Sequence, residues 1–418
     1  MRLGDYINAT KFRFNKYPSH IILYVTARCN ARCKHCFYWE EISSAKKENE
    51  LKIDEIKKIS SSLDRVKLLS ITGGEPTLRD DVPQIVNTFY VNNKIDNVVI
   101  HTNGFFSERT RDMAVQIVKE NPKLELNLAV SIDDLHEGHN QIRNVKGLFE
   151  RDIKTIQLLI EEKEKYKNLH VTINTTYNHF NQHNIRNMID YFYNNFDIDG
   201  YYVSFVRGNS MDKDAKKVDV NKYLETVSYL NQRNIIRRYY DNYPLASFRR
   251  TIDYLAPKLV SRTVKKKKQI YTCTAGKSVV VISEYGNVYP CEMLNSFLPN
   301  DSFGNLRDYE YDLKKVLSTK SAEDIKTFIR NHKCYCTWEC GIMNTIVFNW
   351  AVYPELIYTW LKLEIEKLFG REIELKGDGH LDREPNSNNE QLIKISIPNN
   401  GQSDKTLNPN NEQLVKIS

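Results

Sequence analysis

The chain has 418 residues, of which 41% are hydrophobic and 27% charged, a composition typical of a folded protein rather than a disordered or fibrous one. Lysine and arginine exceed aspartate and glutamate by only seven, 60 against 53, so nucleic-acid binding is not indicated by charge alone. The sequence has no apolar run of the roughly 18 residues that a membrane span needs, and its start lacks the apolar core of a secretory signal. We therefore expect a cytoplasmic protein without a membrane span.

Short β-rich runs alternate with longer polar stretches after a first segment of residues 1–19, which predicts β/α units around a parallel sheet. Six candidate strands are predicted at 21–25, 66–72, 98–101, 124–132, 170–175 and 201–206. Helices are predicted between them at 54–63, 109–120 and 152–167. Six such units fall short of the eight of a closed barrel, so we expect an α/β fold with a partial (β/α)6 TIM-like barrel over residues 20–264.

A second region is expected over residues 265–375, beginning with the lysines 265–268, which we interpret as a solvated linker. It contains a strand-like run at 279–283, a turn at 285–287 and a helical stretch near 322–330, which together predict a small cysteine-rich α+β domain. A closing helix is predicted at 350–369, packed on the body through an apolar face of Ile357, Trp360, Leu361 and Leu368.

The tail, residues 376–418, is poor in aromatic residues and rich in Asn, Asp, Gly and Pro, which predicts disorder. It contains a duplicated motif, NNEQLIKIS at 388–396 and NNEQLVKIS at 410–418. We interpret the repeat as a recent duplication, and a short motif that a partner recognises is the alternative.

The eight cysteines fall into two groups, which in a reducing cytosol are more typical of metal or iron–sulfur ligands than of disulfides. The first group, Cys29, Cys33 and Cys36, directly follows the first predicted strand, on the kind of loop where barrel folds carry their chemistry. Three thiolates hold three irons of a [4Fe–4S] cluster and leave the fourth iron open to a chelating ligand. A zinc site would need a fourth protein ligand, for which His35 is poorly placed.

This cysteine spacing, C-x3-C-x2-C, resembles the cluster loop of the radical S-adenosylmethionine (SAM) superfamily. Further motifs similar to that family follow successive predicted strands: Gly73-Gly74-Glu75-Pro76, Thr102-Asn103-Gly104, and Ser131-Ile132-Asp133 with His139 and Arg143 after it. The resemblance covers roughly residues 20–210. The chain departs from the family pattern at Asp134, where a glycine is usual, and at Asn140, where an aspartate is usual.

The resemblance implies a site that binds a [4Fe–4S] cluster together with SAM. The cofactor-binding residues that it implies are His35, Gly73, Gly74, Glu75, Pro76, Asn103, Ser131 and Arg143. The two glycines let the backbone approach a ligand without a Cβ clash, and the Glu75 carboxylate suits the amino group of SAM. Ser131 would reach a ribose and Arg143 the methionine carboxylate, with an ordinary surface hydrogen bond or ion pair as the alternative for both.

The second group of cysteines resembles the SPASM/twitch extension of many radical SAM enzymes, which holds auxiliary iron–sulfur clusters. Its members are Cys273, Cys291, Cys334, Cys336 and Cys340. Cys273-x12-Gly286-x4-Cys291 matches the opening of that extension, where the glycine supplies a hairpin turn. Five thiolates complete one four-ligand cluster with one to spare, so we expect a single auxiliary [4Fe–4S] cluster, and a structural zinc is the alternative.

The implied activity is reductive cleavage of SAM to a 5′-deoxyadenosyl radical that abstracts a substrate hydrogen. This activity requires an electron donor, such as flavodoxin or ferredoxin. With an auxiliary cluster as electron acceptor, the resemblance implies an oxidoreductase that oxidises or cross-links its substrate. That substrate is either a small molecule, such as a sugar or aminocyclitol, or a peptide or protein. The small molecule is mildly favoured, because only about 20 residues precede the first strand and leave no peptide-recognition domain there.

Two other functions stay open from the sequence. A nucleic-acid-modifying radical enzyme is an alternative, based on the net charge of +7 together with the lysines 265–268, although a nucleic-acid partner is not expected. A non-catalytic iron–sulfur or zinc scaffold, docked through the tail repeat, is disfavoured by the intact cysteine triplet and GGEP motif. The sequence identifies no catalytic base or radical-relay residue.

Overall fold

The computed structural model describes residues 17–237, 239 and 246–368, all within the first of two compact units, residues 1–377. The predicted tail and its repeat, and most of the N-terminal segment, lie outside the described residues.

Within the described residues, nine strands form one sheet in the order β6-β5-β4-β3-β2-β1-β7-β8-β9. The strands are β1 (His20–Thr26), β2 (Leu68–Gly73), β3 (Asn97–Thr102), β4 (Glu125–Ser131), β5 (Leu169–Tyr177), β6 (Gly200–Phe205), β7 (Val279–Ile282), β8 (Asn287–Tyr289) and β9 (Gly304–Asn305). The first six run parallel to their neighbours, which confirms the predicted (β/α)6 partial barrel.

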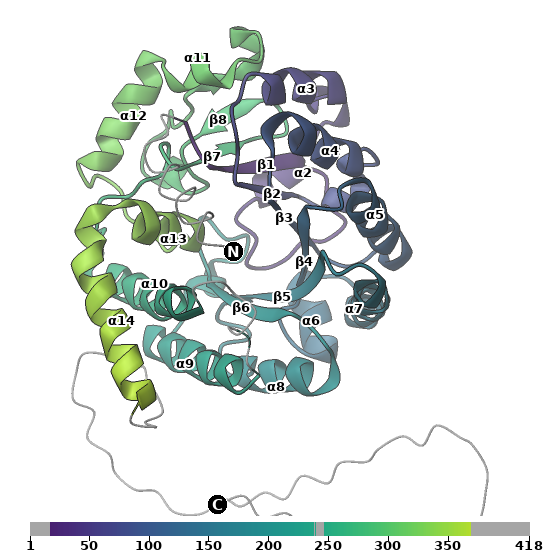
Figure 1. Ribbon diagram of the computed structural model, residues 1–418, viewed down its shortest axis with the longest axis vertical. Helices are drawn as coiled ribbons and strands as arrows, with labels where there is room; N and C mark the ends of the chain where they lie inside the picture. Colours follow the sequence, from purple (N-terminus) through teal and green to yellow (C-terminus); the bar gives the residue numbers. More distant parts are fainter. Residues whose placement is uncertain (1–16, 238, 240–245, 369–418) are drawn as a thin grey trace, which may run out of the picture. The chain divides into compact units, whose positions relative to one another are not determined.

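Helices surround the curved sheet on its outer side, and those that precede β7 in the chain connect its parallel strands (Figure 1). They are α2 (Trp39–Ser43), α3 (Ile53–Ser61), α4 (Val82–Asn93), α5 (Ser107–Glu120), α6 (His136–Arg143), α7 (Leu148–Lys165), α8 (Ile185–Asn195), α9 (Val220–Ile236), α10 (Ala246–Lys266), α11 (Leu313–Leu317), α12 (Lys320–Arg330), α13 (Glu339–Phe348) and α14 (Tyr353–Leu368). Short 3₁₀ turns lie at Lys47–Asn49, Pro76–Leu78, Lys213–Lys216, Leu294–Ser296, Leu306–Tyr309 and Trp350–Val352. The lysine run is exposed, as expected, and its first two residues complete α10.

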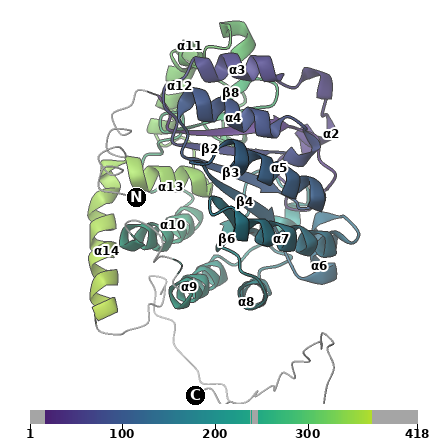
Figure 2. The same ribbon diagram turned by 45° about the vertical axis from the view of Figure 1, so that its right-hand side comes forward.

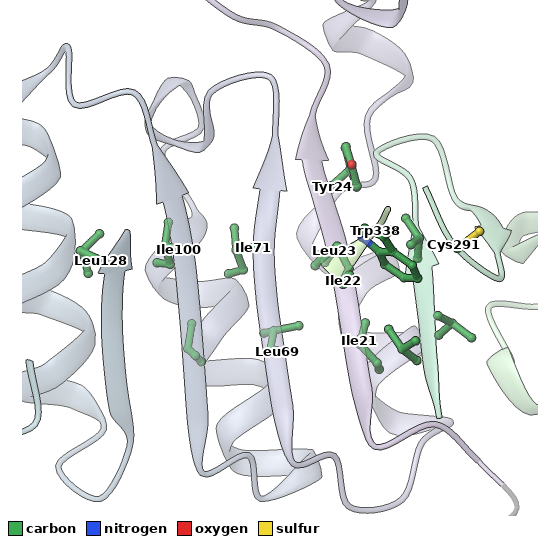
Figure 3. Close-up of a cluster of buried hydrophobic side chains, with 14 of the residues drawn as sticks. Ile21, Ile22, Leu23, Tyr24, Leu69, Ile71, Ile100, Leu128, Cys291 and Trp338 are labelled. Carbon is green, nitrogen blue, oxygen red and sulfur yellow. The ribbon is translucent and has the colours of Figure 1, made fainter. Parts of the chain in front are cut away.

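The core lies between the sheet and its helices. Leu23, Ile71, Ile100 and Leu128 occupy the same level of four adjacent strands, and each is at most 1% exposed (Figure 3). Burying one such side chain contributes about 1.5–3 kcal/mol, so this row fixes the register of the strands. Successive side chains of a strand point to opposite faces of the sheet, so residues such as Tyr24 point away from this core and toward the inside of the barrel. The register of the core thereby sets which residues line that inside.

The cysteine-rich region extends the barrel sheet. Its first strand, β7, pairs in parallel with β1, and β8 returns antiparallel through a turn at Gly286, whose φ of +87° favours glycine. The Trp338 side chain, 1% exposed, packs beside β1 and β7 (Figure 3). The auxiliary domain is therefore built onto the barrel through a shared sheet and a shared core.

The closing helix α14 packs on α10, as predicted, and both lie beside α13 (Figure 2). Its predicted apolar face is wrong, because the side chains of Ile357, Trp360 and Leu361 are 40–53% exposed. The buried side chains are instead Leu356, Thr359 and Leu363, of which none exceeds 6% exposure. The helix carries two apolar stripes, and α10 selects the one in which Leu363 meets Tyr254. The side chain of Leu368 lies outside the described residues.

Candidate active site

The sequence motifs meet at the carboxyl ends of β1 to β4. The cysteine loop (residues 27–38) follows β1, residues 73–76 follow β2, Asn103 follows β3, and Ser131 ends β4. Parallel strands bring their carboxyl ends to one edge of a sheet, which is where barrel enzymes place their active sites. Motifs that are far apart in the chain thus form one candidate site.

The cysteine loop is held by the C-terminus of α6. The Arg32 amide donates to the Arg143 carbonyl at 3.2 Å, and the Lys34 amide donates to the Ile142 carbonyl at 2.9 Å. The last carbonyls of a helix have no partner within the helix, so these two bonds satisfy groups that would otherwise need water. The position of the loop therefore depends on α6 as well as on β1.

The three thiols of this loop are partly buried and lie within electrostatic range of one another. Burial, together with the neighbouring Cys33 thiol, raises the pKa of Cys29 and of Cys36 to about 12. Burial also raises the pKa of Cys33, which Arg143 opposes. Such thiols stay protonated at neutral pH unless a bound metal supplies positive charge, so this donor set fits an iron cluster that displaces the protons.

The glycine turn is forced by a close approach of two backbones. A Cβ on Gly73 would lie 2.2 Å from the Thr26 carbonyl oxygen, and a Cβ on Gly74 would lie 2.2 Å from the Arg28 carbonyl oxygen. Gly73 also has a φ of +135°. The Gly74 amide donates to the Thr26 carbonyl at 2.8 Å, so the turn is joined directly to the start of the cysteine loop. The glycines thus place residues 73–76 against the cluster loop.

The Glu75 carboxylate is 1% exposed and already occupied by the protein. Its Oε1 accepts hydrogen bonds from the hydroxyls of Thr77 and Thr102, at 2.7 and 2.8 Å, and its Oε2 accepts from the Asn103 amide at 2.7 Å. The Asn103 side chain in turn donates to Asn30 Oδ1 at 2.7 Å, beside Cys29. Glu75 therefore ties the β2 and β3 loops together.

A buried ion pair stands beneath the cysteine loop. The Arg143 Nε–H donates to Asp133 Oδ2 at 2.7 Å, and the two side chains are 8% and 0% exposed. Asp133 Oδ1 also accepts from the Thr176 amide at 2.9 Å, and His35 Nε2 lies 3.5 Å from Oδ2. Although burial raises the pKa of Asp133, Arg143 and His35 outweigh it and hold that pKa below its usual range. His35 thus faces this pair.

The five C-terminal cysteines lie around the β7–β8 hairpin and the start of α13. Cys273 and Cys291 flank the hairpin, Cys334 and Cys336 precede α13, and Cys340 lies within it. Burial raises the pKa of Cys291 well above its usual value, and the thiols of Cys336, Cys273 and Cys334 add to the effect, so these four lie close together. They match the number of ligands of one [4Fe–4S] cluster.

In the described part of the chain, no three Cys, His, Asp or Glu side chains converge as ligands of a single metal ion would. Two thiolates on one zinc lie less than about 4.6 Å apart, twice the Zn–S distance. The thiolates of a [4Fe–4S] cluster each bind a different iron and are spaced more widely, so the cysteine groups described here need no such convergence.

The two regions are joined by a buried charged network that the sequence analysis missed. Arg207, after β6, donates through Nη2 to Glu292 Oε2 at 3.0 Å, and the Tyr24 hydroxyl donates to Glu292 Oε1 at 2.8 Å. Arg207 Nη1 lies 4.0 Å from Glu339 Oε2, and the Phe205 amide donates to the other oxygen of Glu339. Burial raises the pKa of Glu339 to about 7. The one available signal was that both glutamates adjoin cysteines of the second group.

Two family models match the chain. Residues 23–192 match the radical SAM superfamily, and residues 273–341 match the SPASM iron–sulfur cluster-binding domain. The matched ranges contain the cysteine loop with the motifs after β2 to β4, and all five C-terminal cysteines.

Curated proteins with similar sequences include enzymes of several pathways. The chain is 26% identical over 307 residues to the antilisterial bacteriocin subtilosin biosynthesis protein AlbA of Bacillus subtilis, covering 71% of this chain and 59% of that protein. It is 30% identical over 173 residues to the Fe-coproporphyrin III synthase of Methanosarcina barkeri, covering 38% of this chain and 41% of that protein. The chain thus spans less than two thirds of either relative.

Solved structures share the fold. SuiB of Streptococcus suis bound to SAM superposes with a TM-score of 0.53 at 18% identity, covering 77% of this chain and 71% of that chain. The enzyme anSMEcpe, with bound SAM and a peptide, superposes with a TM-score of 0.52 at 16% identity, covering 83% of this chain and 100% of that chain.

These matches give the cofactors as SAM, a [4Fe–4S] cluster and auxiliary iron–sulfur binding, which the two cysteine groups fit. No helix among the described residues is long and apolar enough to cross a membrane. Residues 23–192 therefore form a radical SAM domain, and residues 273–341 form a SPASM iron–sulfur cluster-binding domain.

Proposed function

We propose that the chain is an oxidoreductase that uses SAM-derived radical chemistry to oxidise or cross-link a peptide, with one auxiliary iron–sulfur cluster as electron acceptor. The observation that carries this proposal is the position of the two cysteine groups. The cysteine loop follows β1, while Cys273 and Cys291 flank the hairpin whose strand β7 pairs with β1. Both cysteine groups are thus attached to neighbouring strands of one sheet, which supports a substrate bound between them.

When bound, SAM and its cluster supply a 5′-deoxyadenosyl radical that abstracts a hydrogen atom, and an auxiliary cluster accepts the electron left on the substrate. The residues of the chain bind and orient these groups. Arg143 Nη1 and Nη2 make no hydrogen bond to the described residues, which leaves them for the carboxylate of SAM. We assign the amino group of SAM to the backbone of residues 73–76 and its ribose to Ser131, at the end of β4.

The network of Tyr24, Arg207 and Glu292 would hold the substrate side of the two cofactor sites together. The charges of Arg207 and Glu292 compensate each other, because their side chains are in contact, and the Arg207 guanidinium also faces Glu339. A compensated network of this kind keeps a fixed shape in a low-dielectric interior. We therefore assign it a positioning role between the barrel and the auxiliary domain.

A peptide is favoured over a sugar or aminocyclitol as substrate. AlbA, similar over 71% of this chain, is a bacteriocin biosynthesis protein, and the superposed structures include SuiB with its precursor peptide SuiA and anSMEcpe with a peptide. An electron donor of the flavodoxin or ferredoxin class would reduce the first cluster.

The experiment is SAM cleavage under exclusion of oxygen. Full-length protein with reconstituted clusters is mixed with SAM and dithionite, and 5′-deoxyadenosine is measured by liquid chromatography and mass spectrometry. The wild type should form 5′-deoxyadenosine and Cys33→Ala should form none, while Asp324→Asn, on the exposed face of α12, should match the wild type. Equal formation by Cys33→Ala would refute the assigned site, and no formation by the wild type would favour a non-catalytic scaffold.

A further inference from the structure

A cavity of about 270 Å³ lies between the barrel and the auxiliary domain. The barrel contributes Tyr24 of β1 and the end of the cysteine loop, and the auxiliary domain contributes the β7–β8 hairpin with the loop after it. Its lining includes Cys291 of the second cysteine group and Phe37, which follows Cys36 of the first. The cavity is therefore placed where a substrate would meet both cofactor sites.

The lining is strongly acidic. Its four carboxylates belong to Glu41, Glu284, Glu292 and Asp301, and among the described residues no lysine or arginine lines the cavity. Arg207 neutralises Glu292 from behind the wall, but the other three have no cationic partner among the described residues. Their negative charges face the cavity without compensation.

Glu284 is the most telling of these residues. It is 1% exposed, and its carboxylate accepts a hydrogen bond from the Tyr38 hydroxyl, at 2.6 Å to Oε2, and has no cationic partner within the described part of the chain. Burial raises the pKa of Glu284, and it raises that of Asp301 to about 6, as expected for carboxylates that lack a cation. A buried ion of this kind is costly, and an incoming cation would remove the cost.

The aromatic lining and the size of the cavity indicate which kind of cationic group fits it. Five aromatic rings line it, those of Tyr24, Phe37, Tyr38, Tyr285 and Tyr289. Aromatic faces attract ammonium and guanidinium groups and also pack against the methylene stem that carries them. Pockets for whole small molecules usually measure about 300–1,000 Å³. A cavity of about 270 Å³ lies near the lower end of this range and has room for one long side chain.

We propose that this cavity recognises a basic side chain, lysine or arginine, of the peptide substrate. The proposal rests on the proposed function for the identity of the substrate, and it adds the residue that anchors that substrate beside the two cofactor sites. Glu284 and Asp301 bind the cationic head, and the aromatic rings enclose the stem.

The test measures binding of small probes to full-length, cluster-reconstituted protein by calorimetry, without reductant. The probes are acetyl-Gly-Lys-Gly-amide, the same tripeptide with norleucine in place of lysine, and glucosamine as a cation on a small molecule. The lysine tripeptide should bind at least tenfold more tightly than the other two. Equal binding of the norleucine tripeptide, or tighter binding of glucosamine, would overturn the proposal.

Variants locate the binding. Glu284→Gln keeps the shape and the Tyr38 bond but removes the charge, and it should weaken lysine-tripeptide binding about tenfold. Asp301→Asn, in a loop where misfolding is less of a concern, should weaken it in the same direction, while Asp324→Asn on α12 should have no effect. Unchanged binding in both cavity variants would overturn the proposal. Because SAM cleavage is measured separately, lysine-selective binding without 5′-deoxyadenosine formation would contradict the proposed function and leave the cavity assignment standing.

Discussion

The ion pair between Asp133 and Arg143 offers a quantitative test of how the cysteine loop is supported. Asp133→Asn keeps the size of the side chain and an acceptor for the Thr176 amide, but it leaves the Arg143 guanidinium buried without its carboxylate. Removing one partner of a buried pair costs about 3–5 kcal/mol of unfolding free energy. With a urea m-value of about 3 kcal/mol/M, the unfolding midpoint should fall by about 1–1.7 M.

The assay is urea unfolding of the wild type, Asp133→Asn, Arg143→Gln and the double variant. The cycle should give a coupling free energy above about 1.5 kcal/mol, as expected for a buried charge-assisted hydrogen bond. The exposed pair Lys320–Asp324 on α12 is the matched control and should give less than about 0.5 kcal/mol. If the coupling between Asp133 and Arg143 were as small as that of the control, the buried pair would not support the loop as described.

Three further predictions concern the turn, a buried histidine and the tail. Gly74→Ala should weaken SAM binding more than tenfold in equilibrium dialysis, because its Cβ would lie 2.2 Å from the Arg28 carbonyl oxygen. The control Gly147→Asn, at a φ of +65° in open space, should bind SAM normally. Equal binding of SAM by both variants would contradict the close approach. Burial lowers the pKa of His20 to about 4, so acidification from pH 7.5 to 5 protonates this histidine in the unfolded chain but not in the folded one. The wild type should therefore lose about 2 kcal/mol of unfolding free energy that His20→Asn retains, as measured by urea unfolding at both pH values. Parallel pH profiles of the two proteins would refute this. Removal of residues 376–418 should leave SAM cleavage intact, because that segment is predicted to lack a core, and a loss of cleavage would mean that it supports the body.

The sequence was sufficient for features that depend on local pattern. The six strands of the barrel follow from alternating β-rich and polar segments, and each motif lies at a strand end because parallel strands share an edge. The place of Cys29, Gly73 and Asn103 at one edge could therefore be predicted before any contact between them was known.

Features that depend on distant partners could not be predicted. The hydrogen bonds that Thr102 and Asn103 donate to the Glu75 carboxylate depend on how two loops pack. Arg207 and Glu292 pair across 85 positions of the chain, and no spacing rule links them. On α14 two apolar stripes were available, and only the packing of α10 decides between them.

The most direct test of the central claim, two iron–sulfur sites on one sheet, is the iron, sulfide and zinc content of protein purified and reconstituted without oxygen. The account predicts about eight irons and eight sulfides per chain, corresponding to two [4Fe–4S] clusters, and about half of each in the Cys273→Ala/Cys291→Ala variant. About four irons with one zinc per chain would contradict it, because the C-terminal site would then be structural and could not accept an electron.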